Sequence, residues 1–137
     1  MSSASNALEE SIGTHLLRTS AWVKPTNVYM ALFTTLPGED GTGGVEVTGG
    51  SYARINVGPS DANWNLPAGG NGEFSNAVVF TYAVPTANWG NVVGAALYDA
   101  STGGVMQAKA TLDTARNIVA GDPAPNFPVG SIKFVFS

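Results

Sequence analysis

The only histidine in the chain, His15, is the first residue whose chemistry could serve catalysis, because imidazole is the usual general base near neutral pH. A nucleophilic site would also need a serine or threonine hydroxyl within hydrogen-bond reach of that base. His15 falls at the edge of an apolar helical stripe, and the sequence has no G-x-S-x-G nucleophile elbow. We therefore interpret His15 as a partly buried structural histidine and predict no catalytic residues.

Carboxylates offer a second kind of chemistry, either as a glycosidase pair or as ligands for Ca²⁺. The candidates all lie in polar, glycine-rich segments: Glu39, Asp40, Glu46, Asp61 and Glu73. A carboxylate in such a loop is normally solvated, which does not favour a role as a general acid. The spacing of Glu39, Asp40 and Glu46 also differs from that of an EF-hand loop. We therefore expect neither a catalytic carboxylate pair nor a metal site.

Glycine-rich runs at residues 41–44 and 69–72 could in principle bind phosphate through their backbone amides. Neither run lies in the G-x-x-x-x-G-K-[ST] or G-x-G-x-x-G pattern that joins a strand to a helix in nucleotide-binding proteins. Glycine in such runs more often serves turns that need a positive φ. The chain has no cysteine, which excludes disulfides, thiolate ligands and cysteine nucleophiles. The sequence therefore predicts no cofactor.

Apolar side chains in the expected loops are the remaining candidates for binding. Trp64 and Trp89 could stack on a sugar ring, since both are expected in loops. Aromatic residues are also enriched at the centres of protein–protein interfaces. We favour this second interpretation and predict that five residues contact other subunits: Trp22, Leu36, Trp64, Leu66 and Trp89.

The composition is poor in charge and rich in small and apolar residues. Charged residues make up 12% of the chain, against about 25% in an average globular domain, and 17 residues are glycine. The six Lys and Arg residues are scattered singly and the net charge is -4, which argues against binding to nucleic acid or to an anionic membrane. No signal peptide is visible, and no apolar run approaches the ~20 residues of a membrane span. Such a composition is typical of a subunit that buries much of its surface against neighbours.

A helix is predicted over residues 6–19, where apolar residues recur with the helical period. Leu8, Ile12 and Leu16 fall at positions i, i+4 and i+8 and so share one face. Asn6 is expected to cap the start of this helix. A helix with one apolar stripe must dock on another surface, and we expect it to pack on the β body that follows.

From residue 21 onward the period changes to two residues, which predicts a body of about seven β-strands. The expected strands span residues 27–34, 52–57, 76–82, 91–99, 105–112, 116–120 and 131–136, and a further short one is allowed at 45–47. The first is apolar on both faces, so we expect the helix to cover one face and a second sheet or a neighbour to cover the other. The pattern favours a mainly β fold, a jelly-roll-like or immunoglobulin-like β-sandwich with one N-terminal α-helix. The 137 residues fit a single domain, with an N-terminal arm and helix at 1–20 and the β body at 21–137.

Several segments, in this order, resemble a family of small tailed-bacteriophage virion proteins usually labelled tail fibre proteins. The segments are NVYMALFTT (27–35), EVTGGSYARI (46–55), FSNAVVF (74–80), PTANWGNVVGAALYDASTGG (85–104) and AGD (120–122). They span nearly the whole chain, and the blocks GGSYAR and W-G-…-YDA-x-TGG are the most specific. The resemblance implies a virion structural protein without catalytic residues, assembled in the bacterial host cytoplasm. Its place would be in a tail fibre, as a tail accessory, or on the capsid as a decoration (cement) protein.

The missing chemistry, the low charge and the resemblance together lead to one functional prediction. We expect a non-enzymatic homo-oligomer, most simply a trimer, that binds other virion proteins such as capsid or tail subunits and neither nucleic acid nor membrane. The alternative is a receptor- or glycan-binding module at the tip of a fibre. That alternative requires Trp64 or Trp89 to be solvent-exposed beside Asn or Asp side chains.

Overall fold

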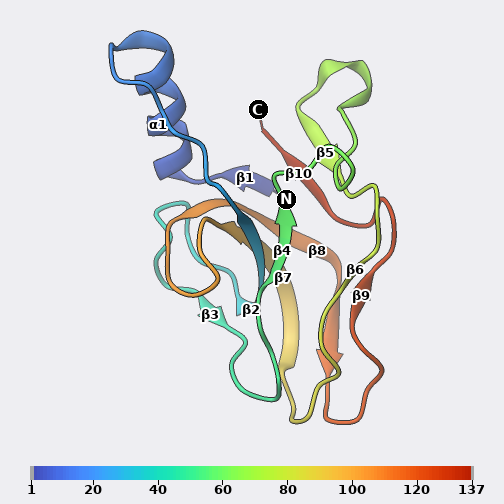
Figure 1. Ribbon diagram of the computed structural model, residues 1–137. Helices are drawn as coiled ribbons and strands as arrows, with labels where there is room; N and C mark the ends of the chain where they lie inside the picture. The colour runs from blue at the N-terminus through green and yellow to red at the C-terminus, as the bar shows by residue number, and fades with distance from the viewer. Residues whose placement is uncertain (1, 137) are drawn as a thin grey trace.

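Two long antiparallel strands form the centre of the larger sheet in the computed structural model, which describes residues 2–136. They are β7 (Gly90–Tyr98) and β8 (Met106–Ile118), joined by residues 99–105. The other strands of this sheet are β1 (Ser2–Ala4), β2 (Val28–Thr35), β3 (Val45–Glu46) and β4 (Ile55–Gly58). The strand order is β1-β8-β7-β2-β3, and β4 also pairs with β2 (Figure 1).

Two small two-stranded sheets form the second layer: β5 (Glu73–Ser75) with β10 (Lys133–Val135), and β6 (Phe80–Thr81) with β9 (Asn126–Phe127). A 3-10 helix, η1 (Ala68–Gly70), precedes β5. Phe127 and Phe134 of this layer share one buried core with Met30 and Val57 of the large sheet. The predicted β-sandwich with an N-terminal helix is therefore confirmed.

The other face of β2 is buried as well. A second apolar cluster on this face contains Ala31, Phe33, Ala96, Tyr98 and Met106. Leu36, from the segment after β2, packs against this cluster and lies where a Cβ on Gly94 would be only 2.5 Å away. Gly94 therefore allows the two backbones to approach. The prediction that both faces of β2 are covered is confirmed, but the segment after β2 provides the cover that we expected from the helix.

Strand boundaries follow the sequence pattern closely at β2 and β7 and depart from it elsewhere. The predicted strands at 105–112 and 116–120 form one continuous strand, β8, whose intervening polar residues lie on an exposed part of the strand. The predicted strand at 76–82 is shortened to residues 80–81, which form β6, and the buried Asn76 lies in the segment between β5 and β6. β1 and β9 have no counterpart in the pattern, since two or three residues are too few to show a period.

The helix α1 (Asn6–Leu17) begins at residue 6, as predicted, but Asn6 is not its N-cap, and the helix points in another direction than expected. Its N-cap is Ser5, whose hydroxyl accepts a hydrogen bond from the Leu8 N at 3.1 Å. The same hydroxyl donates to the Met106 O at 2.5 Å, which ties the cap to β8. The expectation that the whole apolar stripe docks on the body is wrong: Leu8 alone is buried in α1, and the rest of the helix extends away from both sheets (Figure 1).

Within residues 2–136, no helix is long and apolar enough to cross a membrane. The 12 residues of α1 correspond to a length of about 18 Å, well short of a bilayer core of about 30 Å.

Candidate interaction surface

Residues 5–27, which comprise α1 and the chain that returns from it and which we call the arm, are fixed to the β body at their base. β1 pairs with β8 immediately before the arm, and the Ser5 N donates a hydrogen bond to the Gln107 O at 2.8 Å. The next backbone amide donates to the Glu39 O at 2.9 Å. Together with the buried side chain of Leu8, these contacts set the direction in which α1 leaves the body.

The chain returns along one face of α1 after the helix ends. The Trp22 N donates to the His15 Nδ1 at 3.1 Å, and the half-buried Trp22 borders a shallow hollow together with Ala7, Ser11 and Thr14 of α1. His15 is exposed, so the expectation of a partly buried histidine is wrong. Its ring acts within the arm, where it holds the returning chain against the helix.

The second half of α1 exposes apolar side chains on the face that the returning chain leaves uncovered. Ile12 is 47% exposed and Leu16 is 76% exposed, and the two residues lie one helical turn apart. Leu17 and Val23 are more exposed still, at 82% and 85%. Because complete burial of such a side chain is worth roughly 1.5–3 kcal/mol, the single chain leaves a favourable contact unmade.

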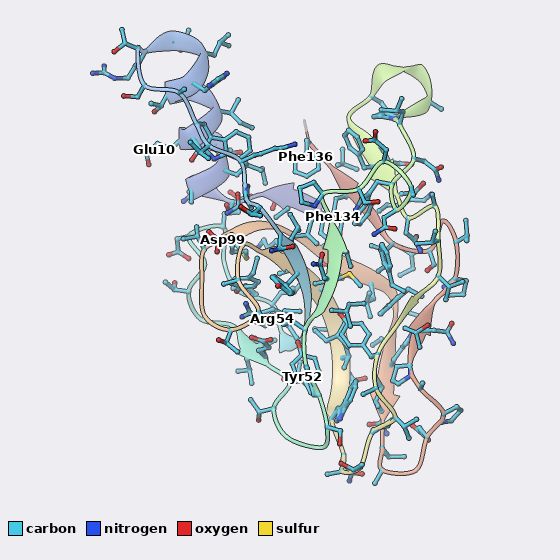
Figure 2. The ribbon with its side chains drawn as sticks, in the orientation of Figure 1. Glu10, Tyr52, Arg54, Asp99, Phe134 and Phe136 are labelled. Atoms are coloured by element: carbon cyan, nitrogen blue, oxygen red, sulfur yellow. The ribbon has the colours of Figure 1, made fainter. Side chains whose placement is uncertain are left out.

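An apolar groove lies at the same end of the sandwich as the arm. It has a volume of about 270 Å³, and its lining residues are Val28, Gly58, Pro59, Trp64, Phe74, Leu97, Phe134 and Phe136. Figure 2 shows Phe134 and Phe136 at the end of the sandwich from which α1 projects. None of the lining residues carries a charge, so a partner would meet an apolar surface.

Aromatic rings form the walls of this groove. The ring centre of Trp64 lies 6.0 Å from that of Phe134, and the Trp64 Nε1 donates to the Val57 O at 2.8 Å. Phe74 and Phe136 meet edge to face with ring centres 5.9 Å apart. Because the indole N–H is already hydrogen-bonded, the side chains of the groove offer carbon atoms to a partner and no free donor.

Three of the five predicted contact residues lie at this end of the molecule. Trp22 is half-buried on the arm, Trp64 lines the groove, and Leu66 is 86% exposed on the loop before η1. Leu36 lies elsewhere, half-buried against the cluster on the other face of β2. Whether any of these residues contacts another subunit stays a prediction.

Trp89 is a core residue in this structure. It is 4% exposed, its Nε1 donates to the Gly50 O at 2.9 Å, and its ring meets Tyr52 edge to face at 5.4 Å. Trp89 lies in a loop, as predicted, but its indole packs in the core between Tyr52 and Tyr82, so it does not meet the exposure that the glycan-binding alternative requires. Trp64 is half-buried, so neither tryptophan forms the open platform that stacking on a sugar requires.

Glu46 is not a solvated loop carboxylate, as its sequence context suggested, but the partner of Arg54. The Nε and Nη2 of Arg54 donate to the two Glu46 oxygens at 2.9 and 2.8 Å, and the Tyr52 hydroxyl donates to the same carboxylate at 2.8 Å. The Nη1 of Arg54 donates to the carbonyls of Ala100 and Gly103. These contacts join β3, the segment entering β4 and the β7–β8 turn, which is a structural role. Figure 2 labels Tyr52 and Arg54.

Burial and this ion pair shift the ionisation of the surrounding groups. Burial raises the pKa of Tyr52 and that of Tyr98, whose ring lies 4.0 Å beneath the Arg54 guanidinium. Burial alone would lower the pKa of Arg54, but the hydrogen bond and the charge of Glu46 outweigh it and raise that pKa. Among residues 2–136, no group of three or more His, Cys, Asp or Glu side chains is placed to hold a metal ion.

Part of this geometry has a signal in the sequence and part has none. The alternation at the end of the chain predicts that Phe134 and Phe136 share a face, and both line the groove. Asn76 gives no such signal, although it is fully buried and hydrogen-bonded. Its Oδ1 accepts from the Ile132 N, 56 residues away, and no local pattern reports a contact of that range.

A family model described as Podophage GP4 fiber I protein gp80 matches residues 3–135, which is nearly the whole chain. No curated protein gives a significant match. The family match confirms the resemblance to phage tail fibre proteins that the ordered sequence blocks indicate. The chain therefore belongs to the Podophage GP4 fiber I protein gp80 family, a family of bacteriophage fibre proteins, and this membership implies a component of the virion.

Proposed function

We propose that this protein is a non-catalytic structural subunit that binds neighbouring virion subunits through the end of the sandwich that carries the arm and the groove. One observation carries the proposal: the apolar side chains of the arm are exposed although the base of the arm is held firmly by the body. A loosely attached arm could bury those side chains by folding back. A fixed arm instead holds them in position for a partner.

The length of α1 supports the same proposal. Isolated helices shorter than about 12–15 residues are marginal in water, and α1 has 12 residues with Gly13 near its middle. Contacts with the body stabilise its first turn through Ser5 and Leu8. Contacts between the remaining turns and another subunit would supply the missing stabilisation, since apolar residues are buried at the centre of an interface.

The partners that we propose are copies of the same chain, with a trimer as the simplest assembly, and other fibre or tail subunits. Family membership favours a place in a fibre over a place on the capsid surface. The low charge supports burial between subunits, because charged side chains are depleted at the core of protein interfaces.

A receptor- or glycan-binding module at a fibre tip has less support. It needs an exposed aromatic side chain beside polar groups that are free to bind a sugar. Trp89 is buried, and the Nε1 of Trp64 and the Nδ2 of Asn63 both donate to the Val57 O. The groove beside Trp64 is apolar, which suits another protein surface better than a sugar.

Sedimentation velocity over a hundredfold range of concentration tests the proposal with two matched variants. Leu16→Ser removes an exposed apolar residue from the arm. Val84→Ser is the control, because Val84 is also exposed but lies between β6 and β7, outside both the arm and the lining of the groove. We expect the natural chain and Val84→Ser to assemble equally and Leu16→Ser to assemble more weakly. A chain that stays monomeric and also fails to bind purified tails or fibres would overturn the proposal.

A further inference from the structure

We infer that α1 of one copy packs into the apolar groove of a neighbouring copy, an inference that rests on the proposed function. The chain carries both halves of this contact. One half is the uncovered face of α1 with Ile12 and Leu16, and the other is the groove walled by Phe134 and Phe136. Both halves lie at the same end of the sandwich (Figures 1 and 2).

The arm is held away from the groove of its own chain. The pairing of β1 with β8 and the hydrogen bonds of Ser5 to Met106 and Gln107 hold the base of α1 in place. Moving the helix across to its own groove would break these bonds and uncover Leu8. The helix of a second copy can approach the groove without that loss, so exchange between copies is favoured over closure within one chain.

The groove has the size and chemistry of a site for side chains. Its volume of about 270 Å³ is smaller than the ~300–1,000 Å³ typical of small-molecule sites. It also lacks the polar groups that would orient a ligand, because the Trp64 indole N–H is bonded to the Val57 O. Ile12 and Leu16 lie roughly 5–6 Å apart along the helix, so both can enter one groove, as in other helix-in-groove contacts.

Exchange of arms favours a closed assembly of copies. Each subunit donates one arm and accepts another, either reciprocally in a pair or head to tail in a ring that closes when the rotation between subunits permits. A helix about 18 Å long covers only part of the ~800 Å² per partner that a standard interface buries. Because each subunit in a ring makes two such contacts, a ring gains more buried area per subunit than a pair joined by one arm.

Disulfide cross-linking tests this inference directly, because the natural chain has no cysteine. Leu16→Cys places a thiol on the arm, and Phe136→Cys or Val28→Cys places one at either of two positions in the groove. Equal amounts of an arm variant and a groove variant are mixed, allowed to exchange subunits and oxidised mildly. Two groove positions are used, each checked by circular dichroism, so that the result does not depend on one variant folding.

We expect most of the cross-linked product to join an arm variant to a groove variant, and the control Val84→Cys to form no product with Leu16→Cys. An oligomer in which Leu16→Cys links mainly to itself would show that arms pack on one another, which overturns the inference. An oligomer with no cross-link between arm and groove overturns it as well. Both outcomes leave the proposed function standing. If sedimentation shows that the chain is monomeric, the inference is overturned, and so is the part of the proposed function that concerns self-assembly.

Discussion

In the β body the apolar residues Leu32 and Phe134 are at most 1% exposed, whereas in the arm Leu16 and Val23 are at least 76% exposed. The two regions use the same kinds of side chain, so composition does not explain the difference. The second layer of the sandwich covers the residues of the body, and no segment within residues 2–136 covers those of the arm. The body therefore buries most of its apolar residues within one chain, whereas the arm leaves its own uncovered, as the proposed contacts between chains require.

Polar groups show the same contrast. Among the side chains that the structure describes, every buried nitrogen and oxygen has a hydrogen-bond partner. Asn76 is the fullest example, because its Nδ2 donates to the carbonyls of Val78, Phe127 and Pro128 while its Oδ1 accepts from the Ile132 N. The buried polar groups of the body are therefore hydrogen-bonded within the same chain. Removing one of these side chains should lower the free energy of unfolding strongly.

The largest loss of stability is expected for Asn76→Leu. The substitution keeps the size of the side chain but leaves three carbonyls and one amide of the second layer without their partner. We expect the free energy of unfolding to fall by about 3–4 kcal/mol, measured by urea denaturation. The control Asn65→Leu alters an exposed residue, whose Nδ2 donates to the Ser75 Oγ, and should change it by less than about 0.5 kcal/mol. If both variants lost the same free energy of unfolding, the buried hydrogen bonds of Asn76 would matter no more than the exposed one of Asn65.

Arg54→Met should cause the next largest loss. It leaves the partly buried Glu46 carboxylate without its cation and releases the β7–β8 turn, which we expect to cost about 2–3 kcal/mol in the free energy of unfolding. Lys133→Met is the control, because its ion pair with Glu73 is long, at 3.8 Å, and exposed. That exposed pair should contribute no more than about 1 kcal/mol. A loss in Lys133→Met as large as in Arg54→Met would contradict the assignment of Arg54 to the body's framework.

Alkaline pH should weaken the body and spare the arm. Burial raises the pKa of Tyr52, Tyr82 and Tyr98 above the ordinary value of 10.0, so the unfolded chain loses these protons first as the pH rises. The stability they contribute is complete below about pH 10 and falls above it, by up to about 1.4 kcal/mol per pH unit for each tyrosine. Urea titrations between about pH 8 and pH 11 should show a shallower fall for Tyr52→Phe and an unchanged fall for Leu16→Ser. If stability fell with pH as steeply in Tyr52→Phe as in the natural chain, the ionisation of Tyr52 could not be a cause of the fall.

The smallest effect on stability is expected for Leu16→Ala in the arm. Measured where the chain is monomeric, it should change the free energy of unfolding by less than about 0.5 kcal/mol, because the side chain makes few contacts to lose. Leu8→Ala, two turns earlier on the same helix, should cost about 2 kcal/mol because Leu8 is buried against the body. Equal changes in the free energy of unfolding for the two variants would contradict the view that Leu8 packs on the body and Leu16 does not.

The sequence predicts the fold well where a local period decides the structure. The expected strands at 27–34 and 91–99 lie within one residue of β2 and β7 at each end, and the expected helix begins at the observed residue. β1 escapes prediction because three small residues carry no period, although they pair with β8 across more than 100 residues. Local patterns therefore predict elements, and they do not predict which distant elements meet.

The candidate surface is predicted less well, for a physical reason. The stripe of Leu8, Ile12 and Leu16 shows that the helix has an apolar face, but periodicity does not reveal whether the covering surface belongs to the same chain. Trp89 illustrates the opposite case, since a tryptophan in a loop-like segment can turn into the core when its N–H finds a carbonyl such as that of Gly50. The groove itself is assembled from segments far apart in the sequence, which no single window contains.

Whether the apolar face of the arm serves assembly or folding can be measured in one variant, Ile12→Ser/Leu16→Ser. Its free energy of unfolding is measured at a concentration where the chain is monomeric, and its mass is measured by sedimentation at high concentration. We predict a free energy of unfolding within about 0.5 kcal/mol of the natural chain, together with loss of the oligomer. A variant that assembles like the natural chain, or that loses more than about 2 kcal/mol of stability as a monomer, would contradict the assignment of this face to contacts between chains.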